Sequence, residues 1–386
     1  MLRFFTAGES HGKGVVVIIE GLPANLPIST DKIRETMRKR KIGVGSGGRQ
    51  LVEDDAVDII SGVRFGKTIG SPIALQIVNK DFSNWGEKMS SEPIDEKIIE
   101  KLKVVKPRPG HADLVGIQKY NLDDVRNVLE RASARETTGR VAAGALFLQF
   151  LEYFDIQVAS HTLQIGNIIN TKPYIFSDIK NVYTTSPETR CIDTDTSDAM
   201  KILVQRARTD MNTLGGVVET WAINVPPGLG SHVHWDRKID GQLAQALMSI
   251  QSVKAIEIGT GFNNASQYGT EVHDEIFYSQ EESYYRKTNR AGGIEGGITN
   301  GMPVIVRAYH KPISTIYKPL HTVNIKTHAD EQATVERSDI CIVPRGGIVS
   351  EAMLAYVLTQ NFIEKFGNDD ILDITNTYQS YLKRIR

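Results

Sequence analysis

Short β-type segments and longer helical segments alternate along all 386 residues of the chain. No Ser/Gly/Pro-rich linker, low-complexity tract or short-period repeat divides the alternation. This pattern predicts an α+β (mixed α/β) fold in a single large domain over residues 1–386. The predicted strands are 15–19, 57–61, 73–78, 217–225, 255–259 and 303–308, and the predicted helices are 30–40, 95–101, 123–130, 136–154, 239–252 and 350–366.

Charge and cysteine content exclude several protein classes. The 45 Lys and Arg residues almost balance the 46 Asp and Glu residues, whereas a dedicated nucleic-acid binder usually carries a basic excess. Cys191 and Cys341 are the only cysteines, so no disulfide framework exists and a reducing compartment is expected. No signal-peptide core begins the chain, and no apolar run approaches the roughly 20 residues of a membrane helix. We expect a soluble cytoplasmic protein.

Glycines are unusually clustered, at 43–48, 292–301 and 346–347, within a total of 33. Glycine permits positive φ and lets backbone amides approach a ligand closely. A tight turn is the alternative interpretation of any single cluster. Three such loops, each beside Arg or Lys, favour anion-binding surfaces.

Two short motifs match known fingerprints without the context that those fingerprints need. Residues 8–12 (GESHG) match the G-x-S-x-G elbow of hydrolases, but 14–20 reads as a strand where a helix should follow. Residues 43–48 match G-x-G-x-x-G, but they follow a basic helix and precede a strand expected within 51–60. The sequence therefore predicts neither a hydrolase nor a Rossmann site. An anion-binding loop, with non-specific nucleic-acid binding as its competitor, fits the surrounding Arg34, Arg38, Lys39, Arg40, Lys41 and Arg49.

Two histidines stand in motifs that could carry proton transfer. His11 lies in the loop before the strand at 15–19, and His111 closes 106–111 (KPRPGH), whose prolines hold a cation and an imidazole in a fixed relation. Imidazole titrates near neutrality and suits general acid–base chemistry. An incidental loop histidine and a stiff surface loop are the alternative interpretations.

A helix start is predicted at Ser133, because Ser133 and Glu136 have capping-box spacing ahead of an apolar stretch. Its unpaired amides, with Arg131 and Arg135 beside them, would suit a phosphate. An ordinary capped helix is the alternative.

Further polar groups follow the strand at 303–308 and precede the last long helix. Residues 311–315 (KPIST) offer an ammonium and two hydroxyls. Asp339 lies two residues after Arg337, and its carboxylate could either form a surface ion pair or act as a base. The pair His232 and His234 lacks a third ligand at metal-site spacing, so we predict no metal.

Together, these segments closely resemble the chorismate synthase family over nearly the whole chain. The matching segments are GESHG at 8–12, RPGHAD at 108–113, ERASARETTGR at 130–140, WDRK at 235–238, GGIEGGITNG at 292–301, KPIST at 311–315 and ERSD at 336–339.

The resemblance implies conversion of 5-enolpyruvylshikimate 3-phosphate to chorismate and phosphate, the last step of the shikimate pathway. It implies a 1,4-anti elimination that needs reduced FMN without net redox change, a homotetramer, and a β-α-β sandwich. No nucleic acid and no membrane are expected as partners. An NADPH-dependent flavin reductase and a non-enzymatic anion- or nucleic-acid-binding scaffold remain the rival functions.

The resemblance also implies roles for individual residues. His11 would protonate the departing phosphate, His111 would hold the protonation state of the flavin ring, and Asp339 would work with the flavin in removing the substrate proton. The implied substrate-binding residues are Ser10, Arg40, Arg49, Arg108 and Arg135. The implied flavin contacts are Arg131, Ala132, Ser133, Gln251, Ser252, Gly296, Lys311, Pro312, Ile313, Ser314, Thr315 and Arg337.

One position departs from the family pattern. The nicotinamide site proposed for the family maps to Arg40 and Ser46, and many members carry arginine where this chain has Ser46. The loop therefore lacks one cation, and direct use of NADPH is placed in doubt.

Basic residues nevertheless gather at 34–49, 106–108, 131–140 and 337–345. If the fold unites these segments, the nearly neutral chain holds one strongly positive cleft.

Overall fold

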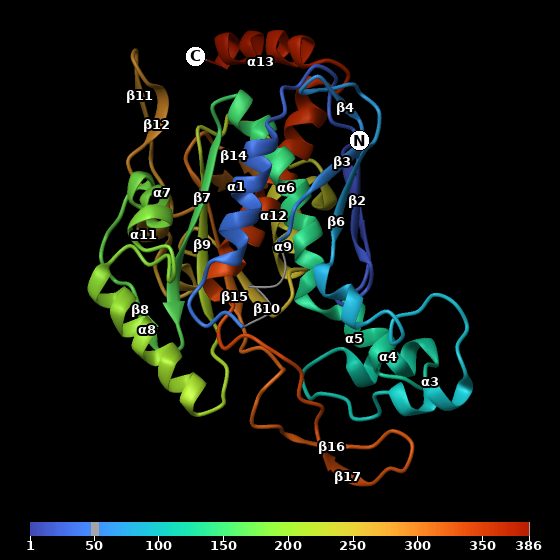
Figure 1. Ribbon diagram of the computed structural model, residues 1–386. Helices are drawn as coiled ribbons and strands as arrows, with labels where there is room; N and C mark the ends of the chain where they lie inside the picture. Colours follow the sequence, from blue (N-terminus) through green and yellow to red (C-terminus); the bar gives the residue numbers. More distant parts are fainter. Residues whose placement is uncertain (48–53, 386) are drawn as a thin grey trace.

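Two antiparallel sheets enclose a layer of helices in the computed structural model, which describes residues 1–47 and 54–385 (Figure 1). The four-stranded sheet has the order β1-β2-β6-β3, with bounds Arg3–Ala7, Gly14–Glu20, Ile73–Val78 and Asp58–Ser61. The five-stranded sheet has the order β10-β15-β9-β7-β8, with bounds Val253–Ile258, Val304–His310, Gly216–Ile223, Gln157–Ile165 and Ile168–Ile169. Every pairing within both sheets is antiparallel.

The helices between the sheets are α1 (Thr30–Lys41), α6 (Thr137–Tyr153), α9 (Ile239–Met248) and α12 (Val343–Phe366). Residues of α6 and α12 are buried on almost every side, because a sheet or another helix faces each side of them. Their Phe147, Phe150 and Phe362 are among the largest fully buried side chains. The predicted mixed fold, a β-α-β sandwich, is confirmed.

Smaller elements surround the sandwich. The helices α3 (Glu96–Leu102), α4 (Asp113–Tyr120) and α5 (Arg126–Ala132) project beside the lower end of the four-stranded sheet in Figure 1, and α13 (Ile371–Ile385) lies across the opposite end. The remaining helices are α7 (Phe176–Thr185), α8 (Thr194–Thr209), α10 (Gly261–Asn264) and α11 (Gly269–Val272), with 3₁₀ turns at η1 (Lys80–Asn84), η2 (Ala134–Glu136) and η3 (Trp235–Arg237). Four short hairpins complete the described elements: β4 (Val63–Arg64) with β5 (Lys67–Thr68), β11 (Ile276–Ser279) with β12 (Ser283–Arg286), β13 (Ile294–Glu295) with β14 (Ile298–Thr299), and β16 (His321–Val323) with β17 (Asp330–Gln332).

Each strand and helix predicted from the sequence overlaps an observed element, although some ends were misplaced. The helix predicted over 239–252 ends at Met248, because Ser252 adopts a φ of 72° in the turn that enters β10. The helix predicted from residue 350 begins at Val343. Of the strand expected within 51–60, residues 51–53 lie outside the described residues, and β3 begins at Asp58. Unpredicted elements include β1, β7, α4, α7, α8 and α13.

The prediction of a glycine loop at 346–347 is wrong, because both residues lie in the first turns of α12. A Cβ on Gly346 would come within 2.8 Å of the His310 ring, and one on Gly347 within 2.5 Å of Ser160 Oγ. The glycines therefore let α12 pack directly on the five-stranded sheet. The cluster at 292–301 does contain a turn, between β13 and β14.

The helix start predicted at Ser133 is confirmed, but the reciprocal capping box is wrong. Ser133 Oγ accepts the backbone N–H of Arg135 at 3.3 Å, and η2 leads into α6 at Thr137. The Glu136 carboxylate instead accepts hydrogen bonds from Thr6, Arg140 and Gln251, which tie α6 to β1 and to the turn before β10.

Within the part of the chain that the structure describes, no helix combines the length and the apolar surface that crossing a membrane requires.

Candidate functional site

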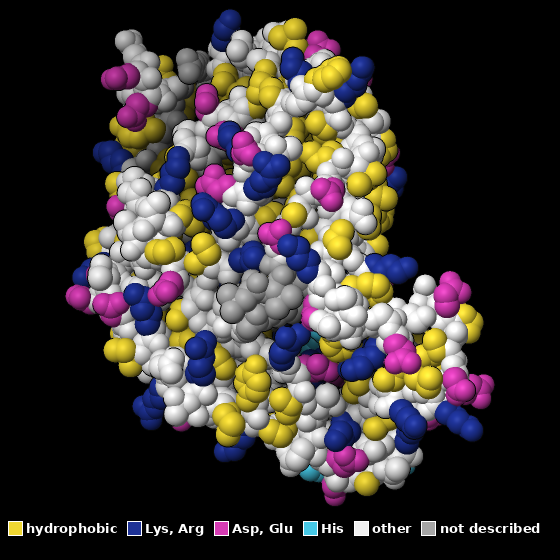
Figure 2. Space-filling model, viewed as in Figure 1, with side chains coloured by type: hydrophobic (Ala, Val, Ile, Leu, Met, Phe, Trp, Pro, Cys, Tyr) yellow, Lys and Arg dark blue, Asp and Glu magenta, His cyan; other side chains and the backbone are white. Residues whose placement is uncertain are grey.

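A cavity of about 390 Å³ opens where the four basic segments meet. This volume lies within the roughly 300–1,000 Å³ of small-molecule sites. The sequence-based expectation that these segments come together is confirmed. In Figure 2, Lys and Arg side chains gather around the centre of the displayed face, with acidic side chains among them.

Most of the candidate site residues line this cavity, although they come from distant parts of the chain. They are Ser10, His11, Arg40, Arg108, His111, Ala132, Ser133, Arg135, Gln251, Ser252, Lys311, Ile313, Ser314, Thr315, Arg337 and Asp339.

The other candidates lie elsewhere. Arg131 directs its guanidinium to the backbone oxygens of Thr6 and Gly8, and Pro312 is absent from the cavity wall. Gly296 lies in the β13–β14 turn, away from the cavity lining. Ser46 donates its hydroxyl to the carbonyl of Gly43 at 2.6 Å, within its own loop, and Arg49 lies outside the described residues.

The arginines of the cavity wall are not left as bare positive charges, which corrects the picture of one strongly positive cleft. Arg40, near the end of α1, and Arg135, in η2, both donate to Asp55, at 3.2 and 2.5 Å. Burial alone would raise the pKa of Asp55, but the charges of the two arginines outweigh burial and lower it. Burial lowers the pKa of Arg40 to about 10, which still leaves a cation at neutral pH. The carboxylate therefore fixes two guanidinium groups and offsets part of their charge.

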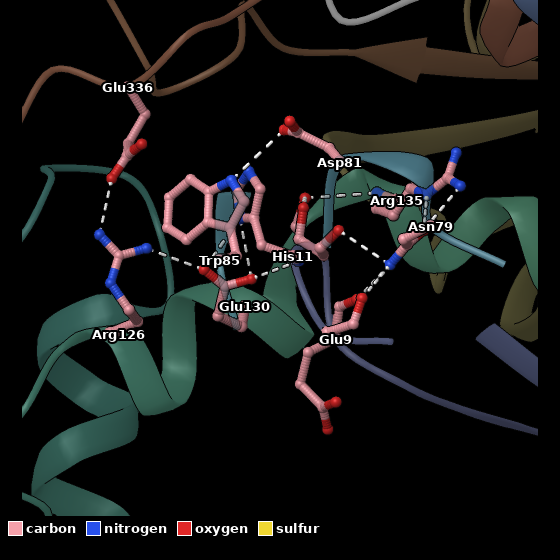
Figure 3. A network of polar contacts seen from close by, with 12 residues as sticks. Glu9, His11, Asn79, Asp81, Trp85, Arg126, Glu130, Arg135 and Glu336 are labelled. Carbon is pink, nitrogen blue, oxygen red and sulfur yellow. Dashed lines mark hydrogen bonds and ion pairs between the residues drawn. The ribbon is translucent and has the colours of Figure 1, made fainter. Parts of the chain in front are cut away.

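Asn79 ties Arg135 to the loop that carries His11. Its Oδ1 accepts from Arg135 Nη2 at 2.7 Å, and its Nδ2 donates to the backbone oxygens of Glu9, Ser10 and Gly12 at 3.2, 3.2 and 2.8 Å (Figure 3). Asn79 is only 2% exposed. The loop before β2 is thus held by a side chain at the end of β6.

His111 and Arg108 share one buried carboxylate. Asp113 Oδ1 lies 2.5 Å from His111 Nδ1, and its Oδ2 accepts from the backbone N–H and Nε of Arg108 at 3.0 and 2.9 Å. Burial alone would raise the pKa of Asp113, but hydrogen bonds from His111 and Arg108 outweigh burial and hold it well below its usual range. Arg108 also donates to Thr315 Oγ1 at 2.7 Å, which joins this turn to the segment after β15.

His11 is held on two sides (Figure 3). Its Nδ1 lies 3.0 Å from both carboxylate oxygens of Glu130, which comes from α5, and its ring stacks on Trp85 with centroids 3.9 Å apart. Arg126 donates to Glu130 at 2.9 Å and lies over the Trp85 ring. Burial alone would raise the pKa of Glu130, but hydrogen bonds from His11 and Arg126 outweigh burial and lower it.

Asp339 lines the cavity beside the glycine loop. Its Oδ1 accepts the backbone N–H of Gly47 at 2.7 Å, and its Oδ2 pairs with Arg345 of α12. Arg337 pairs with Asp81 at 3.0 Å, and Asp81 also accepts from Trp85 Nε1. A proton acceptor thus stands in the same cavity as His11 and His111.

The cavity wall has the polar, apolar and basic groups that a planar, anionic cofactor would need. Gln251 Oε1 and His310 Nε2 are buried polar atoms without a hydrogen-bond partner among the described residues, and both residues line the cavity. Burial lowers the pKa of His310 to about 4, so its ring is neutral at pH 7. These polar groups alternate with an apolar wall that includes Ile250, Ile313, Ile342 and Val349, and Lys311 and Arg337 supply charge.

Within residues 1–47 and 54–385, no cluster of His, Cys, Asp or Glu is arranged to hold a metal ion. His234 is engaged with Asp236, at 2.6 Å.

Sequence reasoning missed several residues that organise the site: Asp55, Asn79, Trp85 and His310. It also gave Glu130 no role, although the residue stood within a matching segment. Each acts through a partner far along the chain, so spacing gives no signal. The weak signals were an isolated Trp in a polar segment and an Asn at the end of a predicted strand.

Comparisons with known proteins agree with this site. A family model described as chorismate synthase matches residues 2–363. The chorismate synthases of Geotalea uraniireducens and Alkaliphilus metalliredigens are each 49% identical, with 100% and 99% of both chains covered, respectively. That of Aquifex aeolicus is 47% identical, with 100% of this chain and 98% of the relative covered. A crystal structure of chorismate synthase matches with a TM-score of 0.79 and 39% identity, covering 100% of this chain and 98% of that one. The chain therefore belongs to the chorismate synthase family.

Proposed function

We propose that this protein is a carbon–oxygen lyase that converts 5-enolpyruvylshikimate 3-phosphate to chorismate and phosphate by 1,4-anti elimination with reduced FMN. The observation that carries the proposal is the convergence of His11, His111, Asp339 and the arginines on one cavity. Membership of the chorismate synthase family supports it. For that family, this reaction is the last step of the shikimate pathway.

The arginines would bind the anionic groups of the substrate, a phosphate and two carboxylates. Guanidinium groups present planar paired donors to such groups. Arg40 and Arg135 share Asp55, and Arg108 is held by Asp113, so all three are oriented before a ligand arrives. Ser10 and Arg49 complete the proposed substrate-binding set.

Two protein groups would handle the protons. His11 donates a proton to the departing phosphate oxygen as the carbon–oxygen bond breaks, and Asp339 accepts the proton lost from the ring carbon. The electrons of the broken carbon–hydrogen bond form the new double bond, so the reaction has no net redox change. The chemistry that bound reduced FMN would supply is transient electron density for the breaking carbon–oxygen bond, without net consumption of the cofactor.

The cavity residues Ala132, Ser133, Gln251, Ser252, Lys311, Ile313, Ser314, Thr315 and Arg337 would hold the flavin. His111, fixed by Asp113, would hydrogen-bond to its ring. The family resemblance alone places three further residues in the proposed flavin-binding set, because they lie outside the cavity wall: Arg131, Pro312 and Gly296. A lysine and an arginine beside the N-terminus of a helix suit the phosphate of FMN.

Direct use of NADPH receives no support from Ser46, whose hydroxyl is bonded within its own loop. We therefore propose that reduced FMN is supplied by another protein or reductant. A homotetramer in the cytoplasm completes the proposal, and light scattering on the purified protein tests the assembly.

An anaerobic assay with photoreduced FMN and substrate tests the function. The proposal requires release of phosphate together with chorismate, and absence of both would reject it. NADPH oxidation with free FMN and no substrate would favour the reductase. Salt-sensitive retention on DNA, without turnover, would favour the binding scaffold.

A further inference from the structure

We propose that Glu130 and Trp85 are positioning residues for His11. Glu130 fixes a proton on Nδ1, so that the transferable proton of His11 is the one on Nε2, and Trp85 fixes the plane of the ring. This inference rests on the proposed role of His11 as the proton donor.

The contacts of Glu130 set which ring nitrogen carries the proton. A carboxylate is only an acceptor, so the ring nitrogen beside it must donate. Both oxygens of Glu130 lie 3.0 Å from His11 Nδ1, and one also accepts the backbone N–H of His11 at 2.8 Å. The lowered pKa of Glu130 keeps it ionised at neutral pH. Nδ1 therefore stays protonated in both charge states of the ring, and Nε2 alternates between donor and acceptor.

The backbone adds to this control. Ser10 N–H donates to the backbone oxygen of Glu130 at 3.0 Å, so the loop before β2 and the end of α5 are joined by both main chain and side chain. The Glu130 side chain is only 1% exposed, and it also pairs with Arg126, four residues earlier on the same helix. Because the Glu130 carboxylate is fixed by these contacts, it restricts the orientation of the His11 ring.

Trp85 limits the remaining freedom of the imidazole, which is rotation of its plane. The two rings are stacked at 21°, with centroids 3.9 Å apart. Trp85 is itself anchored, because its Nε1 donates to Asp81 at 3.3 Å and Arg126 lies 5.0 Å from its ring centroid. Lys88 also lies 5.0 Å from that centroid. Among the described residues, these contacts to His11 come from α5 and from the end of η1.

Kinetics of Glu130→Gln test the first half of the proposal. Glutamine keeps the shape but offers both a donor and an acceptor, so it no longer selects one form of the ring. We expect kcat to fall about 10–10²-fold with KM and flavin affinity little changed. Glu219→Gln is the matched control, because Glu219 is another buried glutamate that contacts a histidine, His161, at 3.2 Å and lies outside the cavity wall. Its kcat per folded molecule should equal that of the wild type.

A spectroscopic measurement tests the same point without catalysis. In ¹⁵N-histidine-labelled protein, the signal that disappears in His11→Asn belongs to His11. At a pH where the ring is neutral, that signal should show the Nδ1–H form in the wild type and a mixture of both forms in Glu130→Gln. An unchanged Nδ1–H signal in the variant would overturn the proposal, and so would a wild-type kcat.

The second half is tested by Trp85→Leu and Trp85→Phe. Leucine removes the stacking partner, and we expect kcat to fall about 2–10-fold, in line with the energy of one aromatic pair. Phenylalanine keeps an aromatic face against His11 but lacks the hydrogen bond to Asp81, so kcat of Trp85→Phe should lie closer to the wild type than kcat of Trp85→Leu. Equal losses in both variants, or a change in KM alone, would remove Trp85 from this role. If the wild type releases no phosphate, the proposed function fails, while the ¹⁵N signal still decides the role of Glu130.

Discussion

His11 and His111, at the cavity wall, are held by the same chemistry but by different parts of the fold. Each ring contacts a buried carboxylate through Nδ1, and each carboxylate also accepts a backbone N–H and pairs with an arginine. His111 and Asp113 lie two residues apart in one turn, whereas His11 and Glu130 are separated by 119 residues. The local pair depends mainly on its own turn, and the distant pair depends on the packing of α5 against the loop before β2. Only His11 also has an aromatic ring stacked on it among the described residues.

Removing the two rings should have unequal effects, and this gives the largest expected difference. His11→Ala should lower kcat by about 10²–10⁴-fold, the usual contribution of a general acid, with FMN affinity preserved. His111→Ala should instead weaken FMN binding. Anaerobic turnover and flavin fluorescence titration measure both. Normal turnover in His11→Ala would place the acid elsewhere.

Removing the carboxylate of Asp113 should lower both the stability of the protein and its affinity for the substrate. Asp113→Ala leaves Arg108 without its carboxylate partner inside the fold, and loss of one member of a buried ion pair costs about 3–5 kcal/mol. Urea denaturation should show this fall in the free energy of unfolding, and KM should rise if Arg108 binds the substrate as proposed. A loss below about 1 kcal/mol would mean that the turn is held by its prolines and backbone alone.

Acid should weaken both pairs. The pKa values of Glu130 and Asp113 are lowered in the folded protein, so each carboxylate binds fewer protons when folded than when unfolded. Their contribution to stability is therefore complete above the unfolded values, about pH 4–4.5, and is lost as pH falls toward the folded values. Urea denaturation between pH 7 and pH 3 should give a shallower acid dependence for Glu130→Gln than for the wild type. Parallel curves would contradict the shift.

The smallest effect concerns the cations around Trp85. Lys88 is exposed and lies 5.0 Å from the Trp85 ring centroid, at the same distance as the partly buried Arg126. Lys88→Ala should change stability by at most about 1 kcal/mol and leave kcat unchanged, since exposed cation–π contacts are weak. A clear loss of kcat would show that stacking on His11 needs both cations.

The same contrast between local and distant contacts explains what the sequence could predict. The pattern of α6 and β6 is local, and their predicted ranges, 136–154 and 73–78, differ from the observed ones by at most one residue. β7 was missed because its buried centre is polar: Ser160 and His161 contact Glu351 and Glu219 of other elements. No periodicity encodes such partners.

The residues of the candidate site show the same contrast between local and distant contacts. Family resemblance supplied the cations and histidines, most of which line the cavity. The carboxylate that pairs two of those arginines, Asp55, lies 80 residues from Arg135, and Asn79 lies 56 residues from it. The charge of Arg135 therefore seemed unopposed in the sequence, because only the fold brings Asp55 close to it.

The contacts of Asn79 join Arg135, a proposed substrate-binding residue, to the loop of His11, the proposed proton donor. A single amide connects Arg135 on one side with three carbonyls of the loop that carries His11 on the other. A ligand that displaces Arg135 should therefore also shift the loop that carries His11. Substitutions at Asn79 should therefore change substrate affinity and turnover together. An inhibitor that binds Arg135 should displace His11 without contacting it.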